Sequence, residues 1–93
     1  MLKFDWDPKK EATNIAKHGV DFGEASTVFV DPDTIDEYDP NHSTGEPSFV
    51  ATGLSDCARI LTVWYAEPTE GNIRIIGARG ASKAERRTFH GLG

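Results

Sequence analysis

The spacing of apolar residues changes along this 93-residue sequence, and the change separates helix-forming from strand-forming segments. Between Asp21 and about Asp31, residues on one face recur every three or four positions, as in an amphipathic helix. From there to about Arg79 the pattern alternates and is rich in β-branched and aromatic residues, as in strands. A chain of this length supports one hydrophobic core, so we expect a single domain over residues 1–93.

Three helix starts are marked by side chains that accept hydrogen bonds from the free N–H groups of a first helical turn. In the first, Asp7 precedes Pro8, and Gly19 supplies the left-handed stop. In the third, Ser82 and Glu85 form a capping box. The predicted helices cover Pro8 to His18, Asp21 to about Asp31, and Ser82 to Phe89.

Strand-like segments fill the region between the second and third helices and also the N-terminus. Loops of five residues separate the last three strands, a length that suits antiparallel hairpins. The predicted strands are Leu2 to Trp6, Thr34 to Asp39, Ser48 to Leu54, Ile60 to Glu67 and Ile73 to Arg79. The order β-α-α-β-β-β-β-α predicts an α+β fold, with the helices on one face of an antiparallel sheet of four to five strands.

The net charge of −5 argues at first against a nucleic-acid partner, but the charge is unevenly distributed. Residues 31–58 carry seven acidic residues and no Lys or Arg, whereas residues 59–93 carry six basic residues and three acidic ones. The basic end suits the phosphates of a nucleic acid, and the acidic stretch suits a cationic partner. Ordinary solvated charges and internal ion pairs explain the same counts.

Arg74 and Arg79 lie in the apolar strand 73–79, where a guanidinium is unexpected. Strict alternation places them on opposite faces, unless a bulge intervenes near Gly77. Each is a candidate phosphate contact, because a guanidinium matches phosphate oxygens with two parallel hydrogen bonds. Solvent-facing or strand-end positions without function account for them equally well.

Tyr65 and Lys17-His18 are further candidates. Tyr65 lies on the face opposite Trp64, and one of the two rings should pack beneath the helices while the other is exposed. An exposed tyrosine is suited to stack on a base or to donate its hydroxyl to a phosphate. Core packing is the more common role for such a tyrosine. Lys17 and His18 follow one another at the end of the first predicted helix, where they complement the helix dipole or serve a site.

Other chemistries find little support. The three histidines and Cys57 lack zinc-ligand spacing, and the acidic residues from Asp31 to Asp39 lack calcium-loop spacing. We therefore expect neither a metal nor a cofactor. A single cysteine, a charged N-terminus and no apolar run long enough to span a membrane favour a soluble cytoplasmic protein.

In three ordered blocks, the sequence resembles the BrnT toxins of bacterial type II toxin–antitoxin systems. The blocks are Phe4 to Lys10 with Asn14 to Phe22 and Glu24-Ala25; Val28-Phe29, Asp31-Pro32, Asp39-Pro40 and His42; and Ile73 to Arg79 with Ala81 to Lys83 and Glu85 to Arg87. The resemblance implies a RelE-like microbial ribonuclease fold and metal-independent RNA cleavage that inhibits translation. It also implies a BrnA-type ribbon-helix-helix antitoxin, two of which pair with two toxins and bind promoter DNA.

With this resemblance, Arg79, Arg74, Tyr65 and His18 are expected to be catalytic, and Lys17, Arg59, Lys83, Arg86 and Arg87 to bind RNA. The chain departs from the family pattern at Gly77, Gly80 and Pro68, where members often carry Ser, a basic residue and Arg. Loss of those polar groups defines the alternative hypothesis, a catalytically weak module that acts as antitoxin partner and co-repressor.

Overall fold

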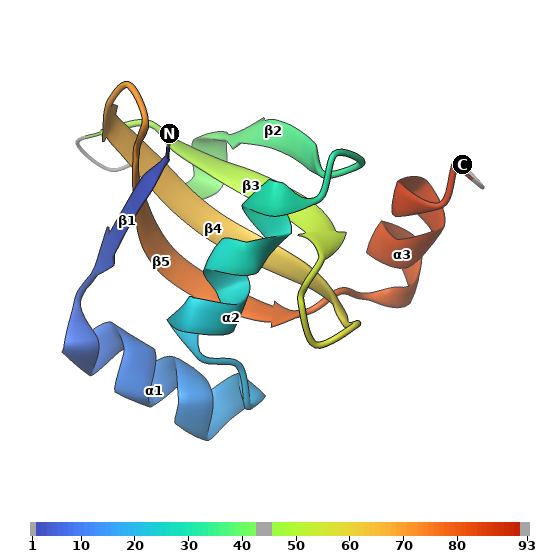
Figure 1. Cartoon of the computed structure of the whole chain (residues 1–93), viewed down its shortest axis with the longest axis horizontal. Coiled ribbons are helices and arrows are strands. Elements are labelled where there is room, and N and C mark those ends of the chain that lie inside the picture. Colours follow the sequence, from blue (N-terminus) through green and yellow to red (C-terminus); the bar gives the residue numbers. More distant parts are fainter. Residues whose placement is uncertain (1, 43–45, 92–93) are drawn as a thin grey trace.

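A five-stranded mixed sheet forms the centre of the molecule, with strand order β1-β5-β4-β3-β2 (Figure 1). The computed structural model describes residues 2–42 and 46–91. The strands are β1 (Lys3–Trp6), β2 (Ile35–Asp39), β3 (Ser48–Leu54), β4 (Ile60–Thr69) and β5 (Asn72–Gly80). The helices are α1 (Pro8–His18), α2 (Phe22–Ser26) and α3 (Lys83–Phe89), with 3₁₀ turns η1 (Thr27–Val30) and η2 (Pro40–His42).

The helix caps act as the sequence predicts. Asp7 accepts a hydrogen bond from Lys9 N–H, Gly19 is left-handed with φ of 68°, and Ser82 closes a capping box with Glu85. The second predicted helix is confirmed in extent, but its second half tightens into η1. Within the described residues, no helix is both long and apolar enough to cross a membrane.

The sheet is mixed, so the prediction of a fully antiparallel sheet is wrong at one strand. The segments β2 to β5 form the expected antiparallel meander, but β1 pairs parallel to β5. The reason is the direct passage of β1 into α1 after Trp6, which lies opposite Ile75 in the register. Because β1 runs parallel to β5 and pairs with residues 72–75, α1 lies beside the remainder of β5, which β1 does not cover.

The core lies on the sheet face covered by α2 and η1, which we call the inner face. Strand residues on this face include Ala51, Val63 and Ile75, which are at most 1% exposed. They pack against apolar residues from α2, η1 and the connection between α1 and α2, namely Val20, Phe22, Ala25 and Val28. Phe4 and Trp6 of β1 extend the same core at the edge.

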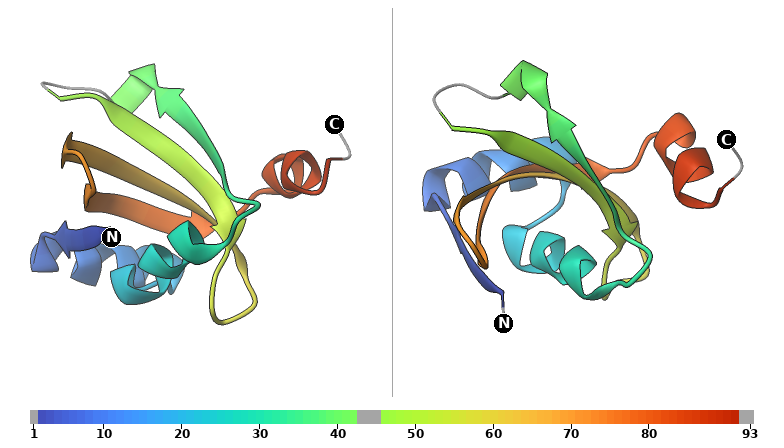
Figure 2. Two further views of the ribbon diagram at one scale, coloured as in Figure 1. Left: turned by 45° about the horizontal axis from the view of Figure 1, so that its top comes forward. Right: turned by 90° about the horizontal axis from the view of Figure 1, so that it is seen from above.

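The opposite, outer face carries Thr62 and Trp64 of β4 and meets α3. Ala84 and Thr88 of α3 border a space of about 200 Å³ with Val50 and Thr52 of β3. Figure 2 shows α3 apart from α1 and α2, beside the end of the sheet. The prediction that all helices share one face is therefore wrong for α3, because its Glu85 is held by outer-face residues.

A bulge in β5 decides where the two strand arginines lie. Trp64 pairs with Gly77 and Tyr65 pairs with Ile75, so Ile76 is the extra residue. The bulge reverses the alternation, and Arg74 and Arg79 both fall on the outer face, opposite Ala66 and Thr62. These partners are four positions apart on β4, which corresponds to about 13 Å along the strand.

Candidate functional site

The α1 helix seals the edge of β5 through the amide side chain of Asn14, which is 8% exposed. Its Nδ2 donates to the carbonyls of Ala78 (2.8 Å) and Val20 (2.9 Å), and its Oδ1 accepts from Ala78 N–H (3.0 Å). The side chain thus supplies both hydrogen bonds that a neighbouring strand would have made. These hydrogen bonds hold α1 against the C-terminal half of β5, at Ala78.

A surface pocket of about 300 Å³ lies where α1 meets the outer face, and we call it the Arg79 pocket. It is lined by Asn14, His18, Trp64, Ile76, Gly77, Ala78 and Arg79. The guanidinium of Arg79 stacks on Trp64, with its Cζ atom 5.0 Å from the ring centroid. The pocket therefore combines a fixed cation, an aromatic surface and an imidazole, a set suited to a phosphate and its nucleoside.

Glu85 of α3 holds Arg79 in place. Arg79 donates to the Glu85 carboxylate through Nη1 (2.8 Å) and Nη2 (3.0 Å), and through Nη1 to the carbonyl of Gly80 (3.1 Å). Partial burial alone would raise the pKa of Glu85, but hydrogen bonds from Arg79, Ser82 N–H and Thr62 lower it to about 2. The ion pair is therefore present over the whole physiological pH range.

Among the described residues, two of the five N–H groups of Arg79 have no acceptor, namely Nε–H and one hydrogen of Nη2. These two donors lie along one edge of the planar guanidinium and are parallel. Such a pair binds two oxygens of a phosphate at once. Glu85 thus orients Arg79 while leaving one donor edge available.

A second hollow, of about 350 Å³, adjoins the Arg79 pocket and shares Asn14, His18 and Ile76 with it. Its other lining residues are Lys9, Lys10, Thr13 and Lys17, and we call it the lysine hollow. Within the described residues, none of these three lysines forms an ion pair. Their charges are available to an anionic ligand that enters the Arg79 pocket.

Among the expected catalytic residues, the structure brings only Arg79 and His18 to one pocket. Arg74 shares the outer face but pairs with Asp5 (3.4 Å) and Glu46 (3.6 Å). Tyr65 is on the inner face, 7% exposed, with its ring against Phe29. Its hydroxyl donates to Asp36 (2.7 Å), and burial together with this bond raises the pKa of Tyr65.

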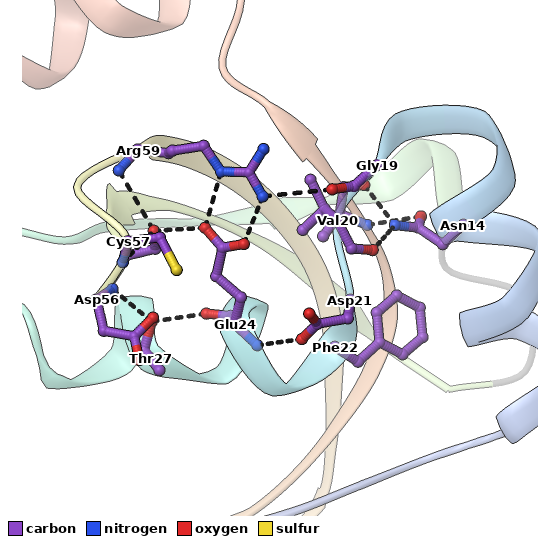
Figure 3. Close-up of polar contacts among 12 residues, drawn as sticks. Asn14, Gly19, Val20, Asp21, Phe22, Glu24, Thr27, Asp56, Cys57 and Arg59 are labelled. Carbon is purple, nitrogen blue, oxygen red and sulfur yellow. Dashed lines mark hydrogen bonds and ion pairs between the residues drawn. The ribbon is translucent and has the colours of Figure 1, made fainter.

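The expected RNA-binding residues divide in the same way. Lys17 lines the lysine hollow, whereas Lys83, Arg86 and Arg87 are exposed on α3. Arg59 is held in a polar network: it binds both carboxylate oxygens of Glu24 and the carbonyl of Gly19 (Figure 3). This ion pair, chiefly through the hydrogen bond from Arg59, lowers the pKa of Glu24 and joins the β3–β4 loop to α2.

Sequence reasoning missed several residues of this site. Trp64 was assigned to packing or an exposed face without a link to Arg79, and Glu85 to the capping box alone. Lys9 and Lys10 were assigned no role from the sequence. Their spacing from Lys17 on a predicted helix was an available signal, since positions seven and eight apart share a helix face. The sealing role of Asn14 had no local signal.

No group of three or more His, Cys, Asp or Glu side chains in the described part of the chain is placed to hold a metal ion. The side chains that line the two hollows supply cations, an imidazole and an aromatic ring. Such a site stabilises developing negative charge and transfers protons through protein groups.

Comparisons with known proteins agree on one family. The sequence model of "Ribonuclease toxin, BrnT, of type II toxin-antitoxin system" matches residues 6–85. The crystal structure of the Brucella abortus ribonuclease toxin BrnT is similar, with a TM-score of 0.64 and 26% sequence identity, covering 89% of this chain and 100% of that one. A comparison with curated protein sequences gave no significant match.

Proposed function

Because the chain belongs to the BrnT family of ribonuclease toxins, we propose that it is an endoribonuclease whose active site is the Arg79 pocket. The observation that carries the proposal is the juxtaposition of Arg79, stacked and oriented, with His18 in one pocket on the outer face. A phosphate bound to the free donor edge of Arg79 would lie in this pocket. A nucleoside beside it would meet Trp64.

The reaction we propose is metal-independent cleavage by the neighbouring 2′-hydroxyl. The 2′-oxygen attacks phosphorus and loses its proton to a base, while the P–O5′ bond breaks and the 5′-oxygen receives a proton. The products are a 2′,3′-cyclic phosphate and a 5′-hydroxyl end. Arg79 stabilises the charge that develops on the phosphate oxygens, and His18 exchanges one of the two protons.

The lysine hollow extends the proposed site along α1. Lys9, Lys10 and Lys17 carry charges that no carboxylate within the described residues neutralises. We propose that the phosphates flanking the cleaved bond follow this surface. Such contacts attract RNA and fix its register without reading its bases.

The remaining elements of the proposal concern fold type and partners. Membership of a type II system implies a protein antitoxin. We propose that the antitoxin is of the ribbon-helix-helix BrnA type, that two toxins and two antitoxins assemble, and that promoter DNA is bound through the antitoxin alone. The RelE-like classification of the fold belongs to the same proposal, and the sequence resemblance supports both.

The test of the active site is cleavage of RNA by the purified chain in EDTA. Replacing Arg79 with Ala should reduce the rate at least a hundredfold, because the charge-stabilising donor pair is lost. Arg74→Ala removes the same charge from the same face outside the pocket and serves as the matched control. It should retain activity within about tenfold, since it lacks a place in the pocket.

Equal rates for Arg79→Ala and the parent chain, with circular dichroism showing both folded, would remove Arg79 from the site. His18→Ala should lose about a hundredfold, the usual contribution of a positioned acid or base. End-group analysis of the products distinguishes the proposed chemistry, because water attack would leave no cyclic phosphate.

A catalytically weak toxin is the second candidate, and the glycine in the pocket favours it. A side chain at Gly77 would meet only Asn14 Oδ1, at 3.7 Å, and one at Gly80 would meet nothing within 4 Å. Neither glycine has the positive φ that would require it. Gly77→Ser should therefore fold normally, and a large gain in cleavage would identify the parent chain as the weakened form.

A further inference from the structure

The outermost strand β2 presents an open edge. It pairs with β3 and, within the described residues, with no other strand. In an antiparallel pair, alternate residues direct their N–H and C=O groups away from the partner strand. The edge of β2 therefore offers unpaired backbone groups to another extended segment, a feature that most proteins cover or guard.

Carboxylates without a cationic partner follow this edge. Asp31, Asp33, Asp36 and Glu37 form no ion pair within the described residues, and no Lys or Arg occurs from residue 31 to 58. Asp36 and Glu37 point to opposite faces of β2, so both sides of the edge are acidic. The potential along β2 consequently attracts a cationic segment and repels an acidic one.

An apolar pocket lies next to the start of β2. Val30 is 82% exposed and Leu54 is 45% exposed, and both line a hollow of about 370 Å³. Asp31 and Asp56 also line it, and Asp31 accepts a hydrogen bond from Leu54 N–H (2.9 Å). Two exposed aliphatic side chains in one pocket, flanked by carboxylates, suit an apolar side chain that has a cation beside it.

We propose that β2 and the Val30–Leu54 pocket are the surface on which the protein antitoxin docks. A cationic segment of the antitoxin adds as a strand to β2, pairs its charges with Asp33 and Glu37, and places an apolar side chain between Val30 and Leu54. A second copy of this chain is a poor occupant, because two β2 edges would set like charges opposite one another.

This inference rests on the antitoxin partnership of the proposed function and is independent of RNA cleavage. The docking surface and the lysine hollow lie at opposite ends of the strand order. RNA, the anionic partner, is thus assigned to the edge that α1 covers, and the cationic segment of the antitoxin is assigned to the edge at β2.

The test compares the free chain with its complex with a BrnA-type antitoxin, the partner of the proposed function. Hydrogen exchange should show new protection of residues 35–39 in the complex, because their outward amides gain partners. Glu37→Lys should weaken antitoxin binding at least tenfold at 0.15 M salt, and the difference should shrink at 1 M salt. The matched control is Glu70→Lys in the β4–β5 turn, which should bind as the parent does.

Val30→Asp provides an independent variant, since it leaves β2 intact and should also weaken binding at least tenfold. Unchanged affinity for Glu37→Lys and Val30→Asp, or protection confined to other segments, would overturn the proposal. The double variant Asp33→Asn/Glu37→Gln gives a further test. If it self-associates and still binds the antitoxin with the affinity of the parent, the proposal is overturned, because the two carboxylates would then serve only to prevent pairing between two β2 edges. RNA cleavage by free Glu37→Lys should equal that of the parent, which separates this test from that of the active site.

Discussion

At one edge of the sheet α1 covers β5 and Asn14 satisfies the exposed backbone, whereas at the other edge β2 is uncovered. The two edges also differ in the sign of their charged side chains. Lysines without ion pairs line the covered edge, and carboxylates without ion pairs line the open one within the described residues. The net charge of −5 conceals two surfaces of opposite sign, which attract opposite partners.

The comparison shows what each kind of edge can support. A covered edge holds side chains in fixed positions, as a reaction requires, because α1 cannot move without breaking the bonds of Asn14. An open edge supplies backbone groups whose geometry is already set and which any compatible strand can use. In the proposed assignment the covered edge acts on RNA and the open edge is held by the antitoxin.

The largest expected effect comes from opening the covered edge. Asn14→Ala removes three buried hydrogen bonds and leaves backbone groups of Ala78 and Val20 without partners. Each unsatisfied buried group costs about 1–3 kcal/mol, so we expect a loss of about 3 kcal/mol in the free energy of unfolding. Urea denaturation measures it.

Glu37→Gln on the open edge is the control for that experiment, and it should change the free energy of unfolding by no more than about 0.5 kcal/mol. RNA cleavage should fall with Asn14→Ala even where the protein remains folded, since His18 and Arg79 lose their common support. If Asn14→Ala and Glu37→Gln lowered the free energy of unfolding by similar amounts, the covered edge would not differ from the open edge in its contribution to stability.

The second effect concerns the charges of the two edges. Replacing Lys9, Lys10 and Lys17 with Gln should weaken RNA binding about tenfold or more and lower the slope of log K against log salt by about 2. Neutralising Asp33 and Glu37 on the other edge should leave the slope unchanged. Titration of a fluorescent single-stranded RNA at several salt concentrations checks both, and a slope that both sets of changes lower would show that RNA covers the whole sheet.

Much of the fold could be predicted from the sequence because its signals are local. Asp7-Pro8, Gly19 and the Ser82 capping box set the ends of α1 and α3, and alternation set the meander. The direction of β1 could not be predicted in this way. It depends on where α1 must lie so that Asn14 reaches Ala78, a contact between residues 64 positions apart.

The candidate site was predicted less well for the same reason. Arg79 and His18 were singled out, but their common pocket depends on the bulge at Ile76 and on the docking of α1, which local patterns do not specify. Tyr65 was singled out by its residue type, and its partner Asp36 lies on a strand 29 positions away. Net charge and composition carry no information about which charges are paired.

The smallest expected effect distinguishes paired from unpaired carboxylates by their response to acid. With a pKa of about 2 in the folded state and an ordinary value of 4.5, Glu85 contributes stability that is fully present above about pH 4.5 and is lost as the pH falls toward 2. Because the ion pair with Arg79 is partly exposed, we expect a contribution of about 1 kcal/mol to the free energy of unfolding.

Glu85→Gln keeps the capping-box geometry, so it should be less stable than the parent by that amount at pH 7 and equal to it near pH 2. Glu37→Gln, which removes an unpaired charge, should follow the parent across this range. Urea unfolding between pH 7 and 2 measures the difference, and parallel curves for Glu85→Gln and the parent would show that Glu85 adds no stability by holding Arg79.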